Sequence, residues 1–526
     1  MGRGDEPSYD PLLWGNSPFV AEGRRVQNKL ATIVFSVLYG GVFLGSFCAY
    51  HNANPKFFEL DDKFLNDPAN CPIDTSHRRL LEAHDQPRFD ASDFASHAVA
   101  WLIISILAST AIAAAFLHLV RHHAHSLARL TIGFQMAVPA TAATMFLLSG
   151  SFGPALLSGA FAALTFAVFY MWRREIGVAS TLLSVAGHGL AANANLIGMT
   201  IALNIGSVFF VLPPLVGAIL GFSVGDVVPN PMRENREACV DEFGVGVTCC
   251  AWQPRTGAMV YIGLAGLVAG WTMLALNQIW VYTVSGTVAQ WYFSPPGTSV
   301  TGNAARSFKH AITTSLGTNI FAGLILTITN LIKQQQQQDQ QNGNFSFFGF
   351  IASCLASLYE YLTKFATVFA AISGDDLLTA GRRVTDLLMR SMLEAFATTV
   401  WFPSAVMSLA SVTLSALWGG AVWASYRYLH HPGGVEEKYP QSNAIVLGVL
   451  VGVVTFFVLS FLMNVLLSVL DSVFVCFAID KDRQTVANAE MYEALLGAME
   501  KRESDSGRGV GVVFEGPDGG LGYGRA

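Results

Sequence analysis

Long apolar runs alternate with short polar stretches along this chain, and the alternation predicts membrane-spanning helices. A helix needs about 20 apolar residues to cross the hydrocarbon core of a bilayer. By that measure about ten segments are candidate spans: Leu30–Tyr50, Ala98–Val120, Ala128–Leu148, Ala155–Trp172, Ala194–Phe222, Met259–Ser285, Ala311–Ile332, Phe345–Ile372, Met392–Tyr428 and Ala444–Phe477. We therefore expect an all-α integral membrane protein with about ten transmembrane helices in a polytopic bundle. The segment Phe345–Ile372 is the least apolar of them, because Glu360 and Lys364 interrupt it and could form an ion pair on a surface helix.

The polar stretches divide the chain into three expected parts. Residues 1–29 form a cytoplasmic N-terminal tail, residues 30–480 a polytopic transmembrane transport domain, and residues 481–526 a cytoplasmic, partly disordered C-terminal tail. Basic residues in the short loops on the same side as the N-terminus agree modestly with the positive-inside rule. Under this topology the stretches His51–His97 and Ser223–Gly257 face outward. The glutamine run Gln334–Gln338 then forms an outward, solvated connector.

Composition confirms the class and excludes several functions. Of the 526 residues 52% are hydrophobic and only 13% are charged, whereas charged residues make up about 25% of a soluble protein. The net charge of −6 offers no basic surface for nucleic acid. The chain has no Walker loop, no paired Cys-x-x-Cys motif and no His-Glu-x-x-His motif. We expect a lipid bilayer as its surroundings, no cofactor, no bound metal, no nucleic-acid partner and no enzymatic activity.

The seven cysteines fall into two groups. Cys48, Cys354 and Cys476 lie in apolar segments and are expected to be packed thiols. The other four lie in the two longest outward loops, where an oxidising exterior would permit disulfides: Cys71, Cys239, Cys249 and Cys250. Four cysteines allow three pairings, and the sequence does not choose among them.

The last apolar segment carries a polar stripe. Ser460, Asn464, Ser468 and Asp471 are spaced four, four and three residues apart, which places them on one helical face. A carboxylate within a membrane helix costs about 2.5–3.5 kcal/mol on insertion scales, so it is rarely without a function. The stripe predicts a water-accessible path, although Asp471 near the membrane surface would also serve as a helix–helix hydrogen-bonding partner.

A second candidate constellation lies in the segment Met259–Ser285. Trp271, Gln278 and Tyr282 are seven and four residues apart and share a face. Aromatic faces hold a quaternary ammonium through cation–π attraction, worth about 2 kcal/mol or more when the cation is desolvated. Packing is the commoner role of aromatic residues in membrane helices, so spacing alone leaves both interpretations open.

Two blocks of sequence resemble the choline transporter-like family. One contains Val284-Ser-Gly and ends in Trp291-Tyr-Phe, and the other runs Asp471-Ser-Val-Phe-Val-Cys-Phe before Asp480. With weaker matches the resemblance extends from about residue 170 to about residue 485, and it is closest to a divergent fungal- or protist-like branch. The chain has Gly317-Thr-Asn where the family usually shows Gly-Ser, so Asn319 replaces a small serine and is a candidate for altered selectivity.

The resemblance implies a secondary transporter or facilitator for choline or a related small organic cation, with the plasma membrane as its default location. In that role Trp271 and Tyr282 would surround the onium group, Gln278 and Asn464 would bind the hydroxyl, and Asp471 would supply counter-charge or a proton site. The alternative is a channel or lipid-handling membrane protein of the same architecture. The oligomeric state, the coupling ion and the direction of transport stay open.

Overall fold

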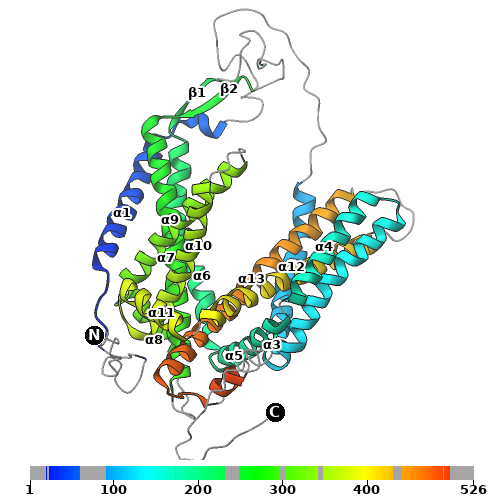
Figure 1. Cartoon of the computed structure of the whole chain (residues 1–526). Helices are drawn as coiled ribbons and strands as arrows, with labels where there is room; N and C mark the ends of the chain where they lie inside the picture. The colour runs from blue at the N-terminus through cyan, green and yellow to red at the C-terminus, as the bar shows by residue number, and fades with distance from the viewer. Residues whose placement is uncertain are drawn as a thin grey trace, which may run out of the picture. The chain divides into compact units, whose positions relative to one another are not determined.

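The structure is a computed structural model that describes residues 19, 23–59, 91–171, 173–230, 239, 248–294, 303–341, 347–391, 393–430, 441–489 and 491–497. Helices dominate these residues, as Figure 1 shows. Their bounds are α1 Lys29–His51, η2 Pro55–Glu59 (a short 3-10 helix), α3 Ala91–Leu148, α4 Phe152–Met171, α5 Arg173–Ala192, α6 Asn195–Phe222, α7 Thr256–Tyr292, α8 Asn303–Ile312, α9 Leu316–Gln341, α10 Phe347–Ser373, α11 Leu377–Ser391, α12 Leu393–His430 and α13 Gln441–Arg483. The strands are β1 Gly225–Pro229 and β2 Cys250–Pro254.

Seven helical segments among the described residues are long and apolar enough to cross a bilayer. They are Lys29–His51, Ile103–His123, Asn195–Phe222, Thr256–Tyr292, Leu316–Gln341, Pro403–Tyr426 and Ile445–Arg483. Large apolar side chains on the outer faces of these helices are exposed, as hydrocarbon contact requires; Phe209 of α6 is 71% exposed. The expectation of an all-α, multi-pass membrane protein is therefore confirmed, while the count of ten spans stays a prediction.

The other three expected spans are helical but shorter or less apolar. Met136–Leu148, the end of α3, and Phe152–Ala167 in α4 are apolar stretches below the length of a full span. The turn expected between the second and third spans is a kink in α3, where His123 leaves helical geometry (φ −135°, ψ 33°). In α10, Glu360 forms an ion pair with Lys333 of α9, so the carboxylate pairs between helices.

The chain divides into two compact units. The first contains residues 1–94, 193–294 and 298–387, and the second contains residues 95–192, 295–297 and 388–526. Unit 1 therefore holds α1, α6 to α10, the hairpin and most of α11, whereas unit 2 holds most of α3 together with α4, α5, α12 and α13.

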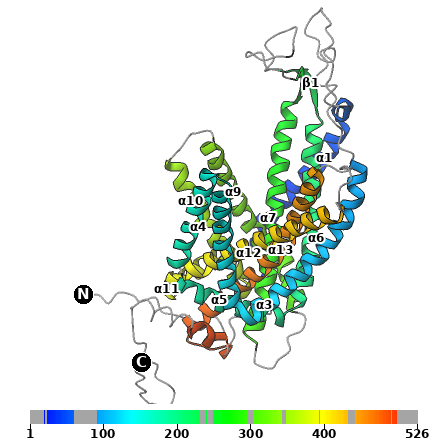
Figure 2. The ribbon, with the colours of Figure 1, turned by 90° about the vertical axis from the view of Figure 1, so that its right-hand side faces the viewer.

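In unit 1, α7 is the central helix and packs against α1, α6, α8, α9 and α10. Small residues permit the closest approach: a Cβ added at Gly323 of α9 would lie 2.6 Å from the backbone nitrogen of Ala275 in α7. The hairpin lies at one end of this unit and α8 and α11 lie at the other in Figure 1, and Figure 2 shows the same separation of β1 from α11. The residues before α1 bind the break between α8 and α9, and those after it bind the hairpin, so α1 runs the length of the unit.

The hairpin replaces part of the expected outward loop Ser223–Gly257. Its strands pair antiparallel, with Gly225 opposite Pro254 and Pro229 opposite Cys250. A disulfide joins Cys239 to Cys249, and Cys250 is also disulfide-bonded. Disulfides in this loop, which the sequence permits, are thus present. Cys48, Cys354 and Cys476 are free thiols; Cys476 is buried as expected, but Cys48 and Cys354 are exposed on α1 and α10, so the expectation that these two are packed was wrong. Since disulfides persist in oxidising compartments, they favour an outward position for this end of unit 1.

In unit 2, α12 and α13 lie side by side and α5 packs on both. The kinked α3 joins them: the Ser109 hydroxyl donates to Thr455 of α13 at 3.0 Å, and the Ser184 hydroxyl of α5 donates to the Arg121 carbonyl at 3.1 Å. The 43 residues of α13 measure about 65 Å at about 1.5 Å per residue. Because the hydrocarbon core is about 30 Å thick, α13 extends well beyond it.

Two local expectations were wrong. The glutamine run is the last part of α9, which continues to Gln341, and Gln336 is buried; glutamine is a good helix former, so the helix has no local reason to stop. The expected span Ala311–Ile332 is broken between Ile312 and Leu316. At the break the Thr314 carbonyl accepts a hydrogen bond from the Gln27 N–H at 3.0 Å. The Thr313 hydroxyl donates to the Lys309 carbonyl at 2.6 Å, alongside the backbone N–H of Thr313.

Candidate functional site

Trp271 lies in the tightly packed layer between α1, α7 and α9. Its side chain is only 2% exposed, and its indole N–H donates to the Ile320 carbonyl at 2.9 Å. The Phe35 ring of α1 meets it edge to face, with 5.0 Å between ring centroids. In the conformation described, Trp271 is therefore a packed residue whose polar edge is satisfied.

Gln278 points from α7 toward α10. It is 2% exposed, and its Oε1 accepts a hydrogen bond from the Thr367 hydroxyl at 2.8 Å. A buried amide that links two helices at mid-length is a costly arrangement in an apolar setting unless its groups are paired. Gln278 thus provides a polar position inside unit 1, as the shared face of α7 predicts.

Tyr282 is fully buried, and its hydroxyl makes two side-chain contacts. It lies 2.8 Å from the Ser315 hydroxyl at the break between α8 and α9. It also accepts a hydrogen bond from the guanidinium of Arg24, a residue of the segment before α1. The second Arg24 nitrogen donates to the Ala371 and Ile372 carbonyls of α10, at 2.9 and 3.3 Å. A cationic group is therefore already held at Tyr282.

Asn319 lies in the first turn of α9, one turn beyond Ser315. Its amide nitrogen donates to the Ala311 carbonyl at 3.0 Å, across the break. Its Oδ1 is buried and, within the described part of the chain, has no hydrogen-bond partner. A buried acceptor left unpaired costs about 1–3 kcal/mol. This oxygen is thus a suitable acceptor for a ligand hydroxyl or a water molecule.

A second buried polar cluster, which sequence reasoning missed, joins the end of α7 to α8. The Gln290 amide nitrogen donates to the Ser307 hydroxyl at 2.7 Å, and its Oε1 accepts from Arg306 at 3.3 Å. Asn303 is 3% exposed, and neither atom of its amide group has a hydrogen-bond partner among the described residues. The only sequence signal was that Gln290 belongs to the Val284–Phe293 block carrying the family resemblance.

The polar stripe of α13 changes its environment along the helix. Asn464 is exposed, whereas Ser468 and Asp471 are each 4% exposed. Asp480, nearer the end of α13, is 1% exposed. Its carboxylate accepts hydrogen bonds from the Thr485 hydroxyl at 3.0 Å and from the Ala487 N–H at 2.9 Å. Asp480 therefore holds the turn that follows α13, while Asp471 lies in the buried part of the helix.

The structure brings some of the predicted site residues together and leaves others apart. Trp271, Gln278, Tyr282 and Asn319 all point into the interior of unit 1, on α7 and α9. Asn464 and Asp471 belong to unit 2. A single pocket containing all six residues stays a prediction.

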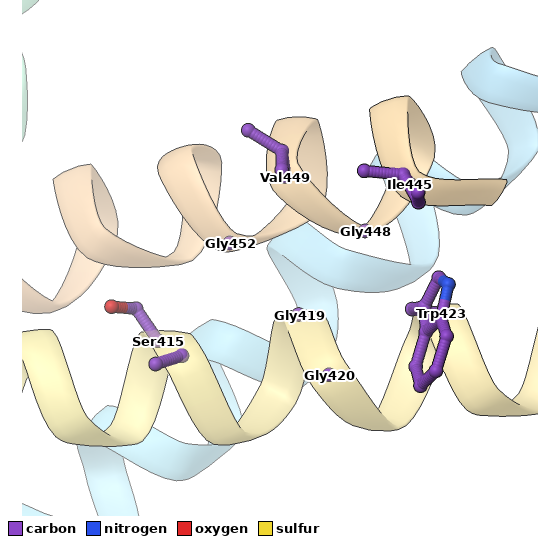
Figure 3. Close-up of a pocket in the computed structure, with 9 residues that line it drawn as sticks. Ser415, Gly419, Gly420, Trp423, Ile445, Gly448, Val449 and Gly452 are labelled. Carbon is purple, nitrogen blue, oxygen red and sulfur yellow. The ribbon is translucent and has the colours of Figure 1, made fainter. Parts of the chain in front are cut away.

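A groove in unit 2 has a different character. It lies between α12 and α13, has a volume of about 300 Å³ and is shown in Figure 3. Its lining is Ser415, Ala416, Gly419, Gly420, Trp423, Ile445, Gly448, Val449 and Gly452. A Cβ added at Gly419 would lie 2.7 Å from the Gly448 carbonyl, so small residues bring the helices together here. The Ser415 hydroxyl is bound to the Val412 carbonyl at 2.8 Å, and the groove is otherwise apolar apart from the Trp423 indole. It suits helix packing or an acyl chain better than a hydroxylated cation.

Long apolar helices that enclose buried polar side chains define the class as a polytopic membrane protein. A family model described as plasma-membrane choline transporter matches residues 156–482, and the chain belongs to this family. The resemblance noted in the sequence is thereby confirmed.

Individual relatives agree with the family. The chain is similar to a CTL-like protein of Dictyostelium discoideum, with 21% identity over 401 residues that cover 71% of each chain. A second CTL-like protein of Dictyostelium discoideum is 29% identical over 105 residues, which cover 19% of each chain. Protein PNS1 of Yarrowia lipolytica is 25% identical over 268 residues, covering 48% of this chain and 44% of PNS1. The match thus spans less than half of the last two relatives.

Proposed function

We propose that this protein is a secondary transporter or facilitator for choline or a related small organic cation, acting in the plasma membrane. Family membership supports the class of substrate. The observation that carries the proposal is that Tyr282, buried inside unit 1, already binds a cationic group through its hydroxyl. The same interior holds the aromatic face of Trp271 and the amides of Gln278 and Asn319.

The proposed roles follow from the chemistry of each side chain. A quaternary ammonium has no N–H to donate, so it is held by aromatic faces, here those of Trp271 and Tyr282. The hydroxyl of choline both donates and accepts; Gln278 and Asn464 are the proposed partners, and the unpaired Oδ1 of Asn319 is a third acceptor.

Asp471 is proposed as the counter-charge or as a proton site. A cation and a proton compete for one carboxylate, which offers a simple route to coupled exchange. Trp271 is packed against α1 and α9, so its ring must be uncovered before it can contact a ligand. Binding therefore requires α1, α7 and α9 to move apart. Such a change is what alternating access between the two sides of a membrane entails.

The test is uptake of radiolabelled choline into proteoliposomes that contain the purified full-length protein. Saturable uptake that unlabelled choline competes with, and that ethanolamine or carnitine reduces according to their likeness to choline, is the expected result. Uptake that rises linearly with concentration would favour the channel alternative. No uptake above that of empty liposomes would overturn the proposal.

A further inference from the structure

The segment before α1 is tied to the end of unit 1 that carries α8 and α11. The Gln27 N–H donates to the Thr314 carbonyl at 3.0 Å, in the break between α8 and α9. The Asn28 side-chain oxygen accepts from the Thr318 hydroxyl at 3.1 Å and from the Leu377 N–H at 3.5 Å. Residues 24–28, which belong to the expected N-terminal tail, are thus bound to unit 1, and we call them the strap.

The strap inserts one side chain, that of Arg24, among three neutral oxygens. These are the Tyr282 hydroxyl and the carbonyls of Ala371 and Ile372, which lie in the last turn of α10. The last carbonyls of a helix lack helical partners and carry its negative partial charge, so they attract cations. The nearby carboxylate of Asp375 is paired with Arg383 at 2.7 Å. The guanidinium is therefore held by oxygens of the kind that bind a free organic cation with N–H donors.

We propose that these oxygens form a site for guanidinium or amine cations, and that Arg24 occupies it as a tethered competitor of the transported substrate. This inference rests on the proposed function, since the competitor acts on the same Tyr282. A fixed positive charge at the Tyr282 hydroxyl repels an onium group at the Tyr282 ring, because like charges close together in a low-dielectric interior interact strongly. The docked strap holds unit 1 in a state that disfavours substrate, and its release admits substrate.

The alternative is that Arg24 is only a structural clamp, and two substitutions separate the cases. Arg24→Ala removes the tethered cation, while Arg25→Ala is the matched control, because Arg25 is exposed and has no hydrogen bond or ion pair among the described residues. Asn28→Gly is a second way to loosen the strap. Asn28 has a left-handed backbone (φ 48°), which glycine adopts freely, so this variant loses only the side-chain bonds.

The first experiment measures thermal unfolding of the full-length protein in detergent with methylguanidinium chloride. We expect methylguanidinium to raise the melting temperature of the Arg24→Ala protein while leaving wild type and Arg25→Ala unchanged. Tetramethylammonium chloride at the same concentration is the control, because it has no N–H to donate to these oxygens. A folded Arg24→Ala protein that methylguanidinium does not stabilise more than wild type would overturn the site.

The second experiment measures choline uptake into proteoliposomes at matched protein content. Arg24→Ala and Asn28→Gly should take up choline with an apparent affinity higher by about tenfold, or about 1.4 kcal/mol. Methylguanidinium should inhibit Arg24→Ala more strongly than wild type. Unchanged or weaker apparent affinity in both variants would show that Arg24 is a clamp. If wild type takes up no choline, the proposed function fails, and the melting experiment still decides the cation site.

Discussion

The guanidinium of Arg24 donates a hydrogen bond to the hydroxyl of Tyr282, a residue 258 positions further along the chain. The same hydroxyl lies 2.8 Å from Ser315, so one buried phenol joins the strap, α7 and the break between α8 and α9. A motion that separates any two of these elements must break a hydrogen bond at Tyr282. This residue is thus placed to couple the strap to the interior of unit 1.

Tyr282→Phe should loosen the strap while keeping the aromatic ring. Loss of the hydroxyl removes one of three acceptors for Arg24 and the partner of Ser315, at a cost of about 1–2 kcal/mol for a buried hydrogen bond. We expect a lower melting temperature, faster protease cleavage before α1 and, because the strap is loosened, an apparent choline affinity that rises toward that of Arg24→Ala. The check is limited proteolysis combined with uptake. Loss of affinity as large as that of Tyr282→Ala would show that the hydroxyl itself binds substrate.

Trp271→Ala should weaken the apparent affinity for choline by about five- to thirtyfold, equivalent to about 1–2 kcal/mol of cation–π attraction. Trp271→Phe should be milder, because it keeps a ring and loses only the hydrogen bond to Ile320. Initial uptake rates across choline concentrations measure the effect.

Truncating Trp271 also opens a cavity, which costs about 3–5 kcal/mol in a well-packed core, so a packing control is needed. Phe35→Ala removes the ring that packs on Trp271 and leaves the indole in place. It should lower the melting temperature without the loss of affinity. An equal loss of affinity in both variants, or unchanged affinity in Trp271→Ala, would refute a direct role for the indole.

The sequence was sufficient for the fold class because hydropathy reports directly on the surroundings of each helix. The apolar runs became helices, and the shared face of Trp271, Gln278 and Tyr282 is buried as its spacing predicts. Burial on a shared face does not reveal partners, however. Nothing in the local pattern distinguishes Arg24, which reaches Tyr282, from the exposed Arg25 beside it.

Two elements that the sequence predicted wrongly also depend on contacts that the local pattern does not contain. The break before Leu316 contains no proline or glycine. Its Thr314 carbonyl accepts from the Gln27 N–H at 3.0 Å and its Ser315 hydroxyl lies 2.8 Å from that of Tyr282, contacts between distant residues that hydropathy does not report. The glutamine run is polar in composition, yet Gln336 packs against Gly349 of α10 and α9 continues through it. Tertiary contacts decided both outcomes.

Asp376 caps the start of α11, and its carboxyl should make the stability of the protein depend on pH only in the acid range. Burial opposes its ionisation, but hydrogen bonds from Thr379 and from the Leu378 and Thr379 N–H groups outweigh burial and lower the pKa of its carboxyl. A lowered folded-state pKa gives stability that is present above the unfolded value of about 3.9 and is lost as the pH falls through the folded value. Melting temperature should therefore not change through this group between about pH 8 and pH 5.

Substitution separates the cap from the charge. Asp376→Ala should cost about 0.5–2 kcal/mol at neutral pH, whereas Asp376→Asn, also a good cap, should cost less. Equal losses in the two variants would show that the negative charge, rather than the capping geometry, stabilises this junction.

The disulfide between Cys239 and Cys249 predicts reduction-dependent labelling from outside the cell. Cys48, a free and exposed thiol in the last turn of α1, lies at the same end, so the experiment uses a Cys48→Ser background. In that background a membrane-impermeant maleimide should label the hairpin end of unit 1 in intact cells only after reduction. The double variant Cys239→Ser, Cys249→Ser should lose part of that labelling and about 2–3 kcal/mol of local stability, from the entropy of a short closed loop. Cys354→Ser, which removes a free thiol, should leave the reduction dependence intact. Labelling that needs permeabilised cells would reverse the topology.

Asp471→Asn should abolish or strongly reduce choline uptake while leaving the protein folded and inserted. The amide keeps the shape of the side chain and removes the charge, which a counter-charge for an onium group or a proton site cannot lose. Asp471 is 4% exposed, in the buried part of a helix about twice as long as the hydrocarbon core is thick. Depth along α13 therefore does not by itself separate a functional acid from a structural one.

Asp480→Asn is the matched control that distinguishes a functional acid from a structural one on this helix. Asp480 lies on the same helix, is 1% exposed and holds the Thr485 hydroxyl and the Ala487 N–H after the helix ends. Its amide variant should show the structural pattern, with lower abundance or melting temperature and near-normal uptake per molecule. If Asp471→Asn shows that same pattern, its carboxylate is a structural acid. Loss of uptake at normal abundance in Asp471→Asn alone would place the charge in the transport path.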